Sequence, residues 1–259
     1  MPEHLNSQGS ALVLGVNAFE PFVNRLHGDF RNAKFSDWPT VILATTFQST
    51  AVSIFKLLPA KSDSSGILDK RSLATLVRNI VDTHDVLEMM VNAPSAEEFE
   101  LNRCILGLYL SSRIDKVRKS VDESNCGDFY THTKSWYWKR IQASPLYSKS
   151  MLQLKNGEQL HYRSRKERAE AACGEDTKFV LGILADLSTF VHSVPPPLWM
   201  GPLENLYSNT QENRDVVAVW LRLANFYLAR CMEVVLKATQ YSPSQQLEEF
   251  LKFHETVFN

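Results

Sequence analysis

Apolar residues recur at helical spacing along most of the chain, and few stretches alternate between apolar and polar residues as strands do. This periodicity predicts an all-α fold, a helical bundle of about seven to nine helices with long antiparallel hairpins. We expect residues 1–259 to form a single helical domain. The expected helices span about residues 10–27, 39–59, 69–92, 95–121, 176–192 and 211–240, and a last one begins near residue 242.

The first expected helix contains a proline and an apolar side. Pro21 should kink or divide this helix, because proline lacks the N–H group that the interior of a helix uses. The apolar residues that we expect near one side of it are Leu14, Phe19, Phe22 and Leu26.

Polar residues and prolines mark several other helix ends. Pro39 fits the first turn of the second helix, where its missing N–H costs nothing. Asp69 can cap the third helix, and Ser95 with Glu98 has the spacing of a capping box that opens the fourth. The prolines at 195–197 should stop the helix that begins near residue 176, because the residue before a proline is pushed out of the α region.

The middle of the chain, about residues 122–174, is predicted to be an irregular segment rich in cations and aromatic residues, with one or two shorter helices. Asn156-Gly157 is the only Asn-Gly in the chain, and this dipeptide favours the tight turn of a β-hairpin. The spacing is compatible with a short two-stranded hairpin. The apolar residues on its two sides are Leu152, Leu154, Leu160 and Tyr162.

Composition narrows the class of protein. With 259 residues, 44% hydrophobic and 22% charged, and a formal net charge of −1, the chain is too apolar for a disordered protein and long enough for one large core. Its four cysteines form neither a disulfide framework nor a zinc-binding CxxC pair. Apolar runs of about seven residues are far short of a membrane span of roughly 20, and the N-terminus lacks a signal-peptide core. We therefore expect a soluble cytoplasmic protein with no membrane partner.

The third expected helix carries Arg78-Asn79 followed, after four residues, by His84. This spacing resembles the signature of HEPN-superfamily ribonucleases, all-helical proteins that cut RNA without a metal and bring the Arg and His of two protomers together in a cleft. The resemblance covers this one helix. It implies that His84 handles a proton of the 2′-hydroxyl or the leaving oxygen, that Arg78 stabilises charge on the phosphate, and that Asn79 orients the pair. Histidine titrates near neutrality and a guanidinium offers a planar fork to a phosphate, so these residue types suit this chemistry.

The same helix supports a purely structural interpretation. Six residues at about 100° each place Arg78 and His84 about 120° apart around the helix. The alternative is a core-facing His84 with one hydrogen bond, beside an exposed Arg78–Asp82 pair. The apolar line of the helix consists of Val77, Ile80, His84, Leu87 and Val91, and the polar line of Arg71, Arg78, Asp82 and Asp85.

A second candidate lies at the end of the helix that the prolines stop, where Ser188 and His192 share one face at i,i+4. This Leu-Ser-x-x-x-His ending, with an Arg-Ser-Leu upstream, looks like a pattern of uncharacterised bacterial all-helical proteins. That likeness implies a polar pocket inside the bundle, built from Arg71 or Arg78 with Glu88 and His192. The alternative is that His192 only caps the helix, whose dipole favours a protonated His, and that Ser188 bonds back to a carbonyl.

Charge is distributed unevenly along the chain. Between Lys134 and Arg168 there are nine cations and two anions, a local net charge of +7 against −8 for the rest. Cations interleaved with aromatic rings suit single-stranded nucleic acid, because Lys and Arg neutralise phosphates while the rings stack on bases. The alternative is a solvated basic face that pairs, in cis or in a partner subunit, with the acidic stretch between Asp82 and Glu100. The residues expected to bind nucleic acid are Trp136, Trp138, Lys139, Arg140, Arg163, Arg165, Lys166 and Arg168.

Several familiar sites are missing from the sequence. No paired E-x-x-H, H-E-x-x-H or Cys/His cluster offers a transition-metal site, and no Gly-rich phosphate loop or dinucleotide motif is present. We therefore expect no metal and no cofactor, ATP and NAD included. Three functions are left open: a HEPN-like, metal-independent endoribonuclease or RNA-binding protein, acting as a homodimer in a defence or toxin-type system; a non-catalytic helical interaction or regulatory module; and a helical sensor of a small ligand.

Overall fold

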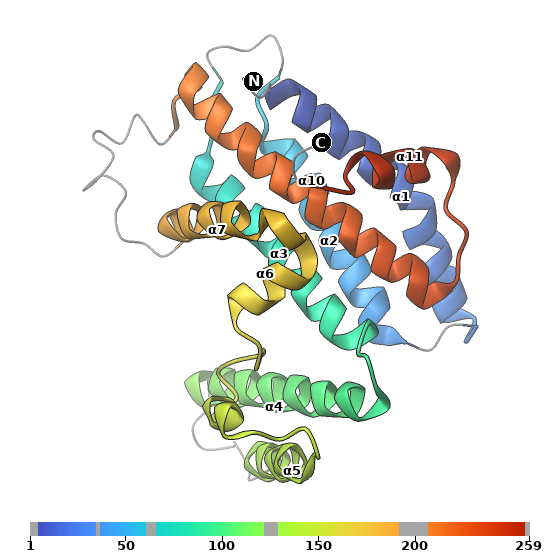
Figure 1. Ribbon diagram of the computed structural model, residues 1–259, viewed down its shortest axis with the longest axis vertical. Coiled ribbons are helices and arrows are strands. Elements are labelled where there is room, and N and C mark those ends of the chain that lie inside the picture. The colour runs from blue at the N-terminus through green and yellow to red at the C-terminus, as the bar shows by residue number, and fades with distance from the viewer. Residues whose placement is uncertain (1–4, 35–36, 61–65, 122–128, 192–206, 257–259) are drawn as a thin grey trace. The chain divides into compact units, whose positions relative to one another are not determined.

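The computed structural model describes residues 5–34, 37–60, 66–121, 129–191 and 207–256. Within these ranges the chain forms nine α-helices and two short 3₁₀-helices and no strand, which confirms the all-α prediction (Figure 1). The chain divides into two compact units. Unit 1 contains Met1–Leu87 and Ala169–Asn259, and unit 2 contains Glu88–Arg168.

Unit 1 is a helical bundle in which elements from both ends of the sequence meet. α10 packs against α1 and α2, and α11 packs against α1 and α10. Helices from the first 87 residues and from the last 91 residues therefore share one bundle. Its elements are α1 (Leu5–Arg31), α2 (Trp38–Leu57), α3 (Lys70–Val91) as far as Leu87, the end of α6 (Arg165–Cys173), η2 (Gly174–Asp176), α7 (Thr177–Val191), α10 (Gln211–Thr239) and α11 (Gln245–Phe253).

α10 is buried on almost every side. Trp220 and Tyr227 are each 1% exposed, and the helix carries apolar residues all round, which is the pattern of a helix inside a core. The Thr210 hydroxyl caps its start by accepting a hydrogen bond from the Asn213 N–H at 3.3 Å. Gln240 ends the helix in the left-handed conformation, with φ of 57°.

α1 differs from its expected course. It begins earlier than predicted and runs on through Pro21 without being divided. Leu14, expected on the apolar side, is 66% exposed. The buried side is set instead by Leu12, Phe19 and Leu26, which recur every seven residues and are at most 1% exposed. The prediction for Leu14 was wrong because it lies about 200° around the helix from Leu12.

Three predicted helix starts are confirmed. Asp69 Oδ1 accepts a hydrogen bond from the Ser72 N–H at 3.1 Å before α3. Ser95 Oγ accepts one from the Glu98 N–H at 3.1 Å before α4. Pro39 lies in the first turn of α2. The proline stop at 195–197 lies outside the described residues.

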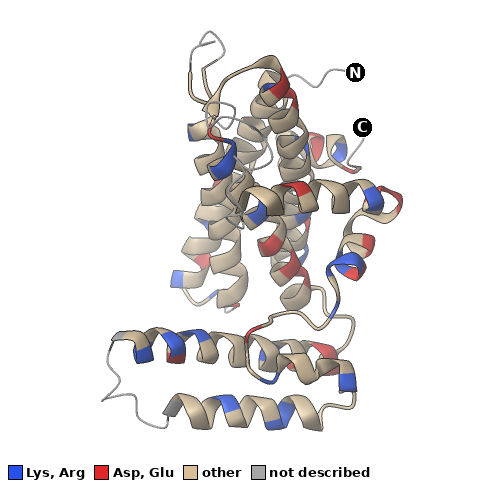
Figure 2. Ribbon diagram, turned by 90° about the vertical axis from the view of Figure 1, so that its left-hand side faces the viewer, with Lys and Arg blue, Asp and Glu red and all other residues tan. Residues whose placement is uncertain are grey.

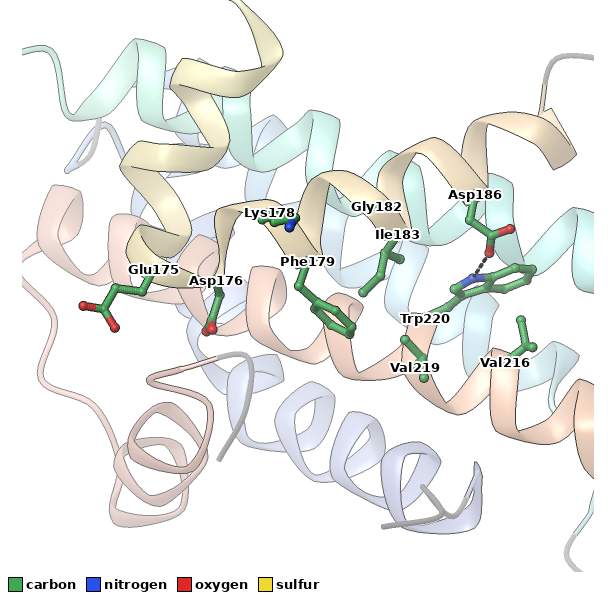
Figure 3. A pocket seen from close by; sticks show the side chains of 10 residues that line it. All are labelled: Glu175, Asp176, Lys178, Phe179, Gly182, Ile183, Asp186, Val216, Val219 and Trp220. Atoms are coloured by element: carbon green, nitrogen blue, oxygen red, sulfur yellow. Dashed lines mark hydrogen bonds between the residues drawn. The ribbon is translucent and has the colours of Figure 1, made fainter.

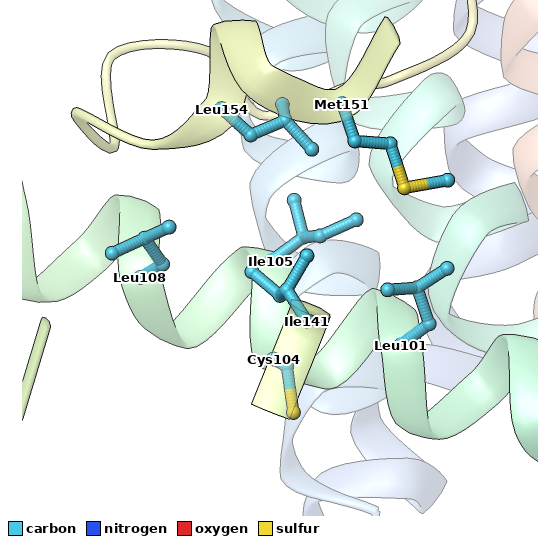
Figure 4. Packing of buried hydrophobic residues seen from close by; sticks show 7 residues of the cluster. All are labelled: Leu101, Cys104, Ile105, Leu108, Ile141, Met151 and Leu154. Carbon is cyan, nitrogen blue, oxygen red and sulfur yellow. The ribbon is translucent and has the colours of Figure 1, made fainter. Parts of the chain in front are cut away.

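Unit 2 is built on two helices that pack side by side, α4 (Ala96–Val121) and α5 (Phe129–Ala143). Their approach is close at Gly107, where a Cβ atom would lie 2.3 Å from the Tyr137 ring. The 3₁₀-helix η1 (Lys149–Leu154) adds its apolar side to the same core (Figure 4). The buried core residues are Leu101, Cys104, Ile105, Leu108, Ile141, Met151 and Leu154.

The β-hairpin expected around Asn156-Gly157 does not form, and this prediction was wrong. Met151 and Leu154, three residues apart, both reach the core, which helical spacing allows and strand alternation does not. A tight turn does form at this dipeptide, because Gly157 adopts the left-handed conformation that glycine favours, with φ of 64°. The Ser112 hydroxyl of α4 donates to the Asn156 carbonyl at 2.8 Å and so holds the turn against α4.

α2 is the one helix of the described residues that is long and apolar enough to cross a membrane, with a mean hydropathy of 1.2. Of this stretch, 44% is buried inside the bundle. Ala44, Phe47 and Ile54 on its inner side are fully covered. Packing against α1 and α10 accounts for the apolar residues on this inner side.

Candidate functional site

Arg78, the first residue of the HEPN-like spacing, reaches from α3 to α7. Its Nη1 donates a hydrogen bond to Ser188 Oγ at 2.7 Å, and its Nε lies 3.6 Å from the Asp82 carboxylate one turn along α3. The Ser188 hydroxyl donates to the Leu184 carbonyl at 2.7 Å, so the expected back-bond is confirmed. The expected Arg78–Asp82 pair is also present, but the Arg78 side chain is only 16% exposed. The guanidinium therefore ties two helices together.

His84 lies in the core of unit 1. It is 2% exposed, and its ring meets the Tyr227 ring of α10 edge-on with 5.0 Å between centroids. Its Nδ1 lies 3.5 Å from the Asp85 carboxylate. The apolar line through His84 therefore faces the core, as the structural interpretation predicts. Asp85, expected on the exposed polar line, is only 8% exposed.

Asp85 is covered because the end of α6 and α10 pack over this part of α3. The Cys173 thiol of α6 and the Tyr227 hydroxyl lie 3.4 Å apart. Burial, with a smaller contribution from the nearby carboxylates of Asp176 and Asp85, raises the pKa of Cys173 to about 11. The thiol is therefore held in its protonated form at neutral pH.

Within one chain, the three residues of the HEPN-like spacing do not share an accessible cleft. Arg78 is directed to Ser188 of α7, and His84 is directed to Tyr227 of α10. Asn79, between them in sequence, is exposed. This arrangement supports the structural interpretation of His84, and RNA cleavage at this helix stays a prediction.

The expected polar pocket stays a prediction, because one of its residues lies outside the part of the chain that the structure describes. Arg71 is exposed, and Glu88 accepts a hydrogen bond from the Asn92 amide at 2.9 Å. Arg71 and Glu88 stand 17 residues apart on one continuous helix, which is about 25 Å. His192 lies outside the described residues.

The burial of two ionisable residues could not be predicted from the sequence. Lys70, the first residue of α3, is 3% exposed, and its Nζ donates to Asn213 Oδ1 at 2.6 Å; burial lowers its pKa. His254, after α11, is 5% exposed, and burial together with the charge of Arg222 lowers its pKa to about 4. Sequence reasoning missed both because distant helices cover them.

In unit 2, part of the basic segment pairs with the acidic start of α4. Arg140 Nη2 lies 2.7 Å from Glu100 Oε1, and Arg163 pairs with Glu98. The Tyr162 hydroxyl also donates to Glu98, at 2.7 Å. The alternative prediction, a basic face that pairs in cis with this acidic stretch, is confirmed for these two arginines.

Asp115 of α4 is a second ion-pair centre, and the sequence did not single it out. It is 5% exposed and accepts from Lys134 of α5 at 2.5 Å and from Lys119 at 3.1 Å. The hydrogen bond from Lys134, with smaller contributions from Lys119, lowers the pKa of Asp115. Lys134 therefore helps to join α5 to α4.

The outer face of α5 combines an exposed ring with cations. Trp136 is 51% exposed, and the Arg140 guanidinium lies 4.9 Å from its ring centroid. Lys139, three residues after Trp136, is exposed on the same face. Trp138 instead packs against the core of unit 2 and meets Tyr147 edge-on at 6.1 Å. Of the two expected tryptophans, Trp136 is the accessible one.

No acidic residue occurs from 129 to 157, a stretch with five cations. Figure 2 shows Lys and Arg on α5 without Asp or Glu. Lys139, Lys149 and Lys155 are exposed, and none has an ion pair within the described residues. The other cations expected to bind nucleic acid lie at the start of α6 and are Arg165, Lys166 and Arg168.

Sequence and structure together place an accessible set of candidate residues on α5 rather than on α3. Among the described residues, no group of three or more His, Cys, Asp or Glu side chains is arranged to hold a metal ion. Comparison with known proteins finds no match among family models, curated proteins or solved structures.

Proposed function

We propose that this protein binds single-stranded RNA through the outer face of α5 in unit 2. The observation that supports the proposal is the half-exposed Trp136 beside Lys139 and Arg140, in a segment without acidic residues. An exposed indole can stack on any base, and the two cations beside it can neutralise backbone phosphates. This pairing of ring and charge is the pattern of sequence-tolerant binding to single strands.

The charge of the unit agrees with this proposal. Residues 88–168 hold 14 Lys and Arg against 10 Asp and Glu, a net charge of +4, whereas the rest of the chain carries −5. The Arg140–Glu100 pair has side chains that are 48% and 43% exposed, and exposed pairs contribute only about 0–1 kcal/mol. Arg140 can therefore exchange Glu100 for a phosphate. Lys134 stays with the buried Asp115 and serves the fold.

The proposal is one of binding rather than cleavage. His84 is 2% exposed and Arg78 is held by Ser188. A phosphate could reach both side chains only if α3 separated from α7 and α10. Binding at α5 needs no such rearrangement, because Trp136, Lys139 and Arg140 already lie at the surface.

Fluorescence anisotropy tests the proposal, with the full-length protein and a labelled U-rich RNA of about 12 nucleotides in EDTA. For four phosphate contacts, affinity should fall about 50-fold between roughly 50 and 200 mM salt. Trp136→Ala should weaken binding roughly 5- to 150-fold through lost stacking. Lys139→Ala should lower the slope of log affinity against log salt by about 0.7.

Matched controls lie in unit 1. Trp38 of α2 is 50% exposed, nearly the same as Trp136, so Trp38→Ala controls for loss of an exposed indole. Lys178→Ala, on α7, controls for loss of an exposed cation. Equal losses in the test and control variants, or affinity that does not change with salt, would overturn the proposal.

A further inference from the structure

A groove with a volume of about 710 Å³ lies between α7 and the first half of α10, within unit 1 (Figure 3). Its apolar lining comes from both helices. Figure 3 shows the Phe179 ring directed from α7 toward α10. The apolar residues that line the groove are Phe179, Ile183, Val216, Val219 and Trp220.

The groove is open because small and buried residues form its middle. A Cβ atom on Gly182 of α7 would meet nothing within 4 Å, so this position leaves space above the floor. Trp220 and Ile183 form the floor and are 1% and 7% exposed. Phe179 forms a wall and is 37% exposed. Among the residues that the structure describes, this floor and wall form one continuous apolar surface between the two helices.

The edge of the groove is acidic. Glu175, Asp176 and Asp186 line it together with one cation, Lys178. Asp186 Oδ2 accepts a hydrogen bond from the Trp220 indole N–H at 2.8 Å, which fixes this carboxylate beside the apolar floor. The lining thus carries a net charge of −2 next to an apolar surface.

We propose that this groove binds an amphipathic helix of a partner protein whose apolar face is flanked by Lys and Arg. The lining of η2 and α7 runs from residue 175 to residue 186, about 16 Å at helical rise, which matches three turns of a docked helix. Apolar anchors at i, i+3 or i+4, and i+7 would enter above Gly182. The flanking cations would meet Glu175 and Asp186, since complementary charge sets the orientation and the choice of partner.

This surface is distinct from the RNA-binding face proposed on α5. Its carboxylates repel phosphates, so a nucleic acid does not fit the groove. All the residues that line the groove lie on η2, α7 and α10 of unit 1, so loss of RNA binding at α5 would leave the groove unaffected.

A direct test uses synthetic peptides and the full-length protein. The probe is a fluorescein-labelled helical peptide of about 16 residues, with Leu at i, i+3, i+4 and i+7 and Lys elsewhere. One control peptide keeps the Leu positions and carries Glu for Lys, and a second scrambles the Lys peptide to remove its apolar face. By anisotropy, the probe should bind at least about 10-fold more tightly than either control.

Substitutions in the groove locate the binding. Gly182→Arg places bulk and positive charge in the open space and should weaken probe binding at least about 10-fold. Gly28→Arg on α1 is the matched control, because a Cβ there also meets nothing within 4 Å. Asp186→Asn removes one charge and keeps an acceptor for the Trp220 indole. It should weaken binding about 3- to 10-fold and reduce its salt dependence.

The melting temperature of each variant is measured first, to show that the variant is folded. Probe binding that Gly182→Arg and Asp186→Asn leave unchanged would overturn the proposal, as would equal binding of the Glu peptide. Self-association of the parent protein that Gly182→Arg abolishes would also overturn it, since a second copy would then fill the groove. If Gly182→Arg lowers the melting temperature, Asp186→Asn and Phe179→Ala carry the same test.

Discussion

The guanidinium of Arg78 donates a hydrogen bond to the hydroxyl of Ser188 at 2.7 Å, across 110 residues of sequence. The bond joins α3 to α7 inside unit 1. Arg78 is the residue that the HEPN-like spacing would assign to a phosphate, and in this structure it connects two helices of the bundle. Because the donor is charged and largely covered, loss of its partner should be felt in stability.

A double-mutant cycle measures this bond. Ser188→Ala and Arg78→Met should each destabilise unit 1, and the coupling energy between them should be about 1.5–3 kcal/mol, as for a hydrogen bond to a charged group. Urea denaturation of the four proteins gives the value. A coupling energy near zero would show that the bond contributes nothing. Thr75→Ala and Arg71→Met, exposed or half-buried positions on α3, are the matched pair.

His84→Ala separates packing from catalysis. The ring is 2% exposed against Tyr227, so its removal should leave a cavity and lower the free energy of unfolding by about 1–3 kcal/mol. RNA binding at α5 should not change. Asn79→Ala, at an exposed position, is the control. A His84→Ala protein with unchanged stability that has lost an RNA-cleaving activity of the parent, measured in EDTA, would contradict this expectation and restore the HEPN-like assignment.

The sequence was most informative where one helix face meets the core. The apolar line of α3 was correct at Val77, Ile80, His84 and Leu87, all at most 2% exposed, because period 3.6 alone defines such a face. The assignment of Asp85 to the polar line did not show that this residue is covered, because the helices that cover it come from more than 80 residues away in sequence. Local pattern does not show which elements pack on a polar side.

The candidate site on α5 was visible in part. The excess of cations with Trp136 among them is a property of composition, so the sequence alone could direct attention to this segment. The pairing of Arg163 with Glu98 and of Lys134 with Asp115 was not visible by residue, because it depends on how α4, α5 and the following loop pack. The sequence did not separate Trp138 from Trp136: two residues later on the helix, Trp138 lies about 200° around it and packs, partly buried, against the core of unit 2.

Gly107→Ala should destabilise unit 2 in particular. A Cβ there would lie 2.3 Å from the Tyr137 ring, so α4 and α5 must move apart, at a cost of about 1–3 kcal/mol. Amide hydrogen exchange should speed up in α4 and α5. Gly182→Ala is the control, since its Cβ meets nothing and a helical Ala is favoured over Gly by about 0.5–1 kcal/mol. Unchanged exchange in α5 would show that the Tyr137 ring moves freely.

Three cysteines should resist alkylation in the folded protein. Cys104 and Cys231 are buried, and the pKa of Cys173 is about 11. At pH 8 the thiolate fraction of Cys173 should give a rate roughly two orders of magnitude below that of a free cysteine. A Cys126→Ser protein, which removes the cysteine outside the described residues, isolates these three. Iodoacetamide labelling followed by mass spectrometry should be slow without urea and complete with it. Rapid labelling of folded Cys173 would contradict the burial of its thiol.

His254 should make the fold sensitive to mild acid. Its pKa is about 4 in the folded chain, because burial and then the nearby Arg222 disfavour the charged form, against about 6.5 when unfolded. The unfolded chain therefore binds a proton below about pH 6.5 that the folded chain binds only near pH 4. Stability is lost as pH falls through this window, by about 2 kcal/mol between pH 7 and pH 4.5, and this residue adds no further loss below pH 4.

His254→Gln, which does not titrate, should remove that loss. The quantity to compare is the difference in unfolding free energy between pH 7 and pH 4.5, measured by urea denaturation for the parent and the variant. His132→Gln is the control for the substitution itself, because His132 is an exposed histidine on α5. The Gln side chain also costs some stability at neutral pH, but that cost is the same at both pH values and cancels in the comparison. An equal acid sensitivity in the parent and in His254→Gln would contradict this prediction. It would mean that His254 takes up its proton over the same pH range in the folded and the unfolded chain, so that neither burial nor Arg222 lowers its pKa.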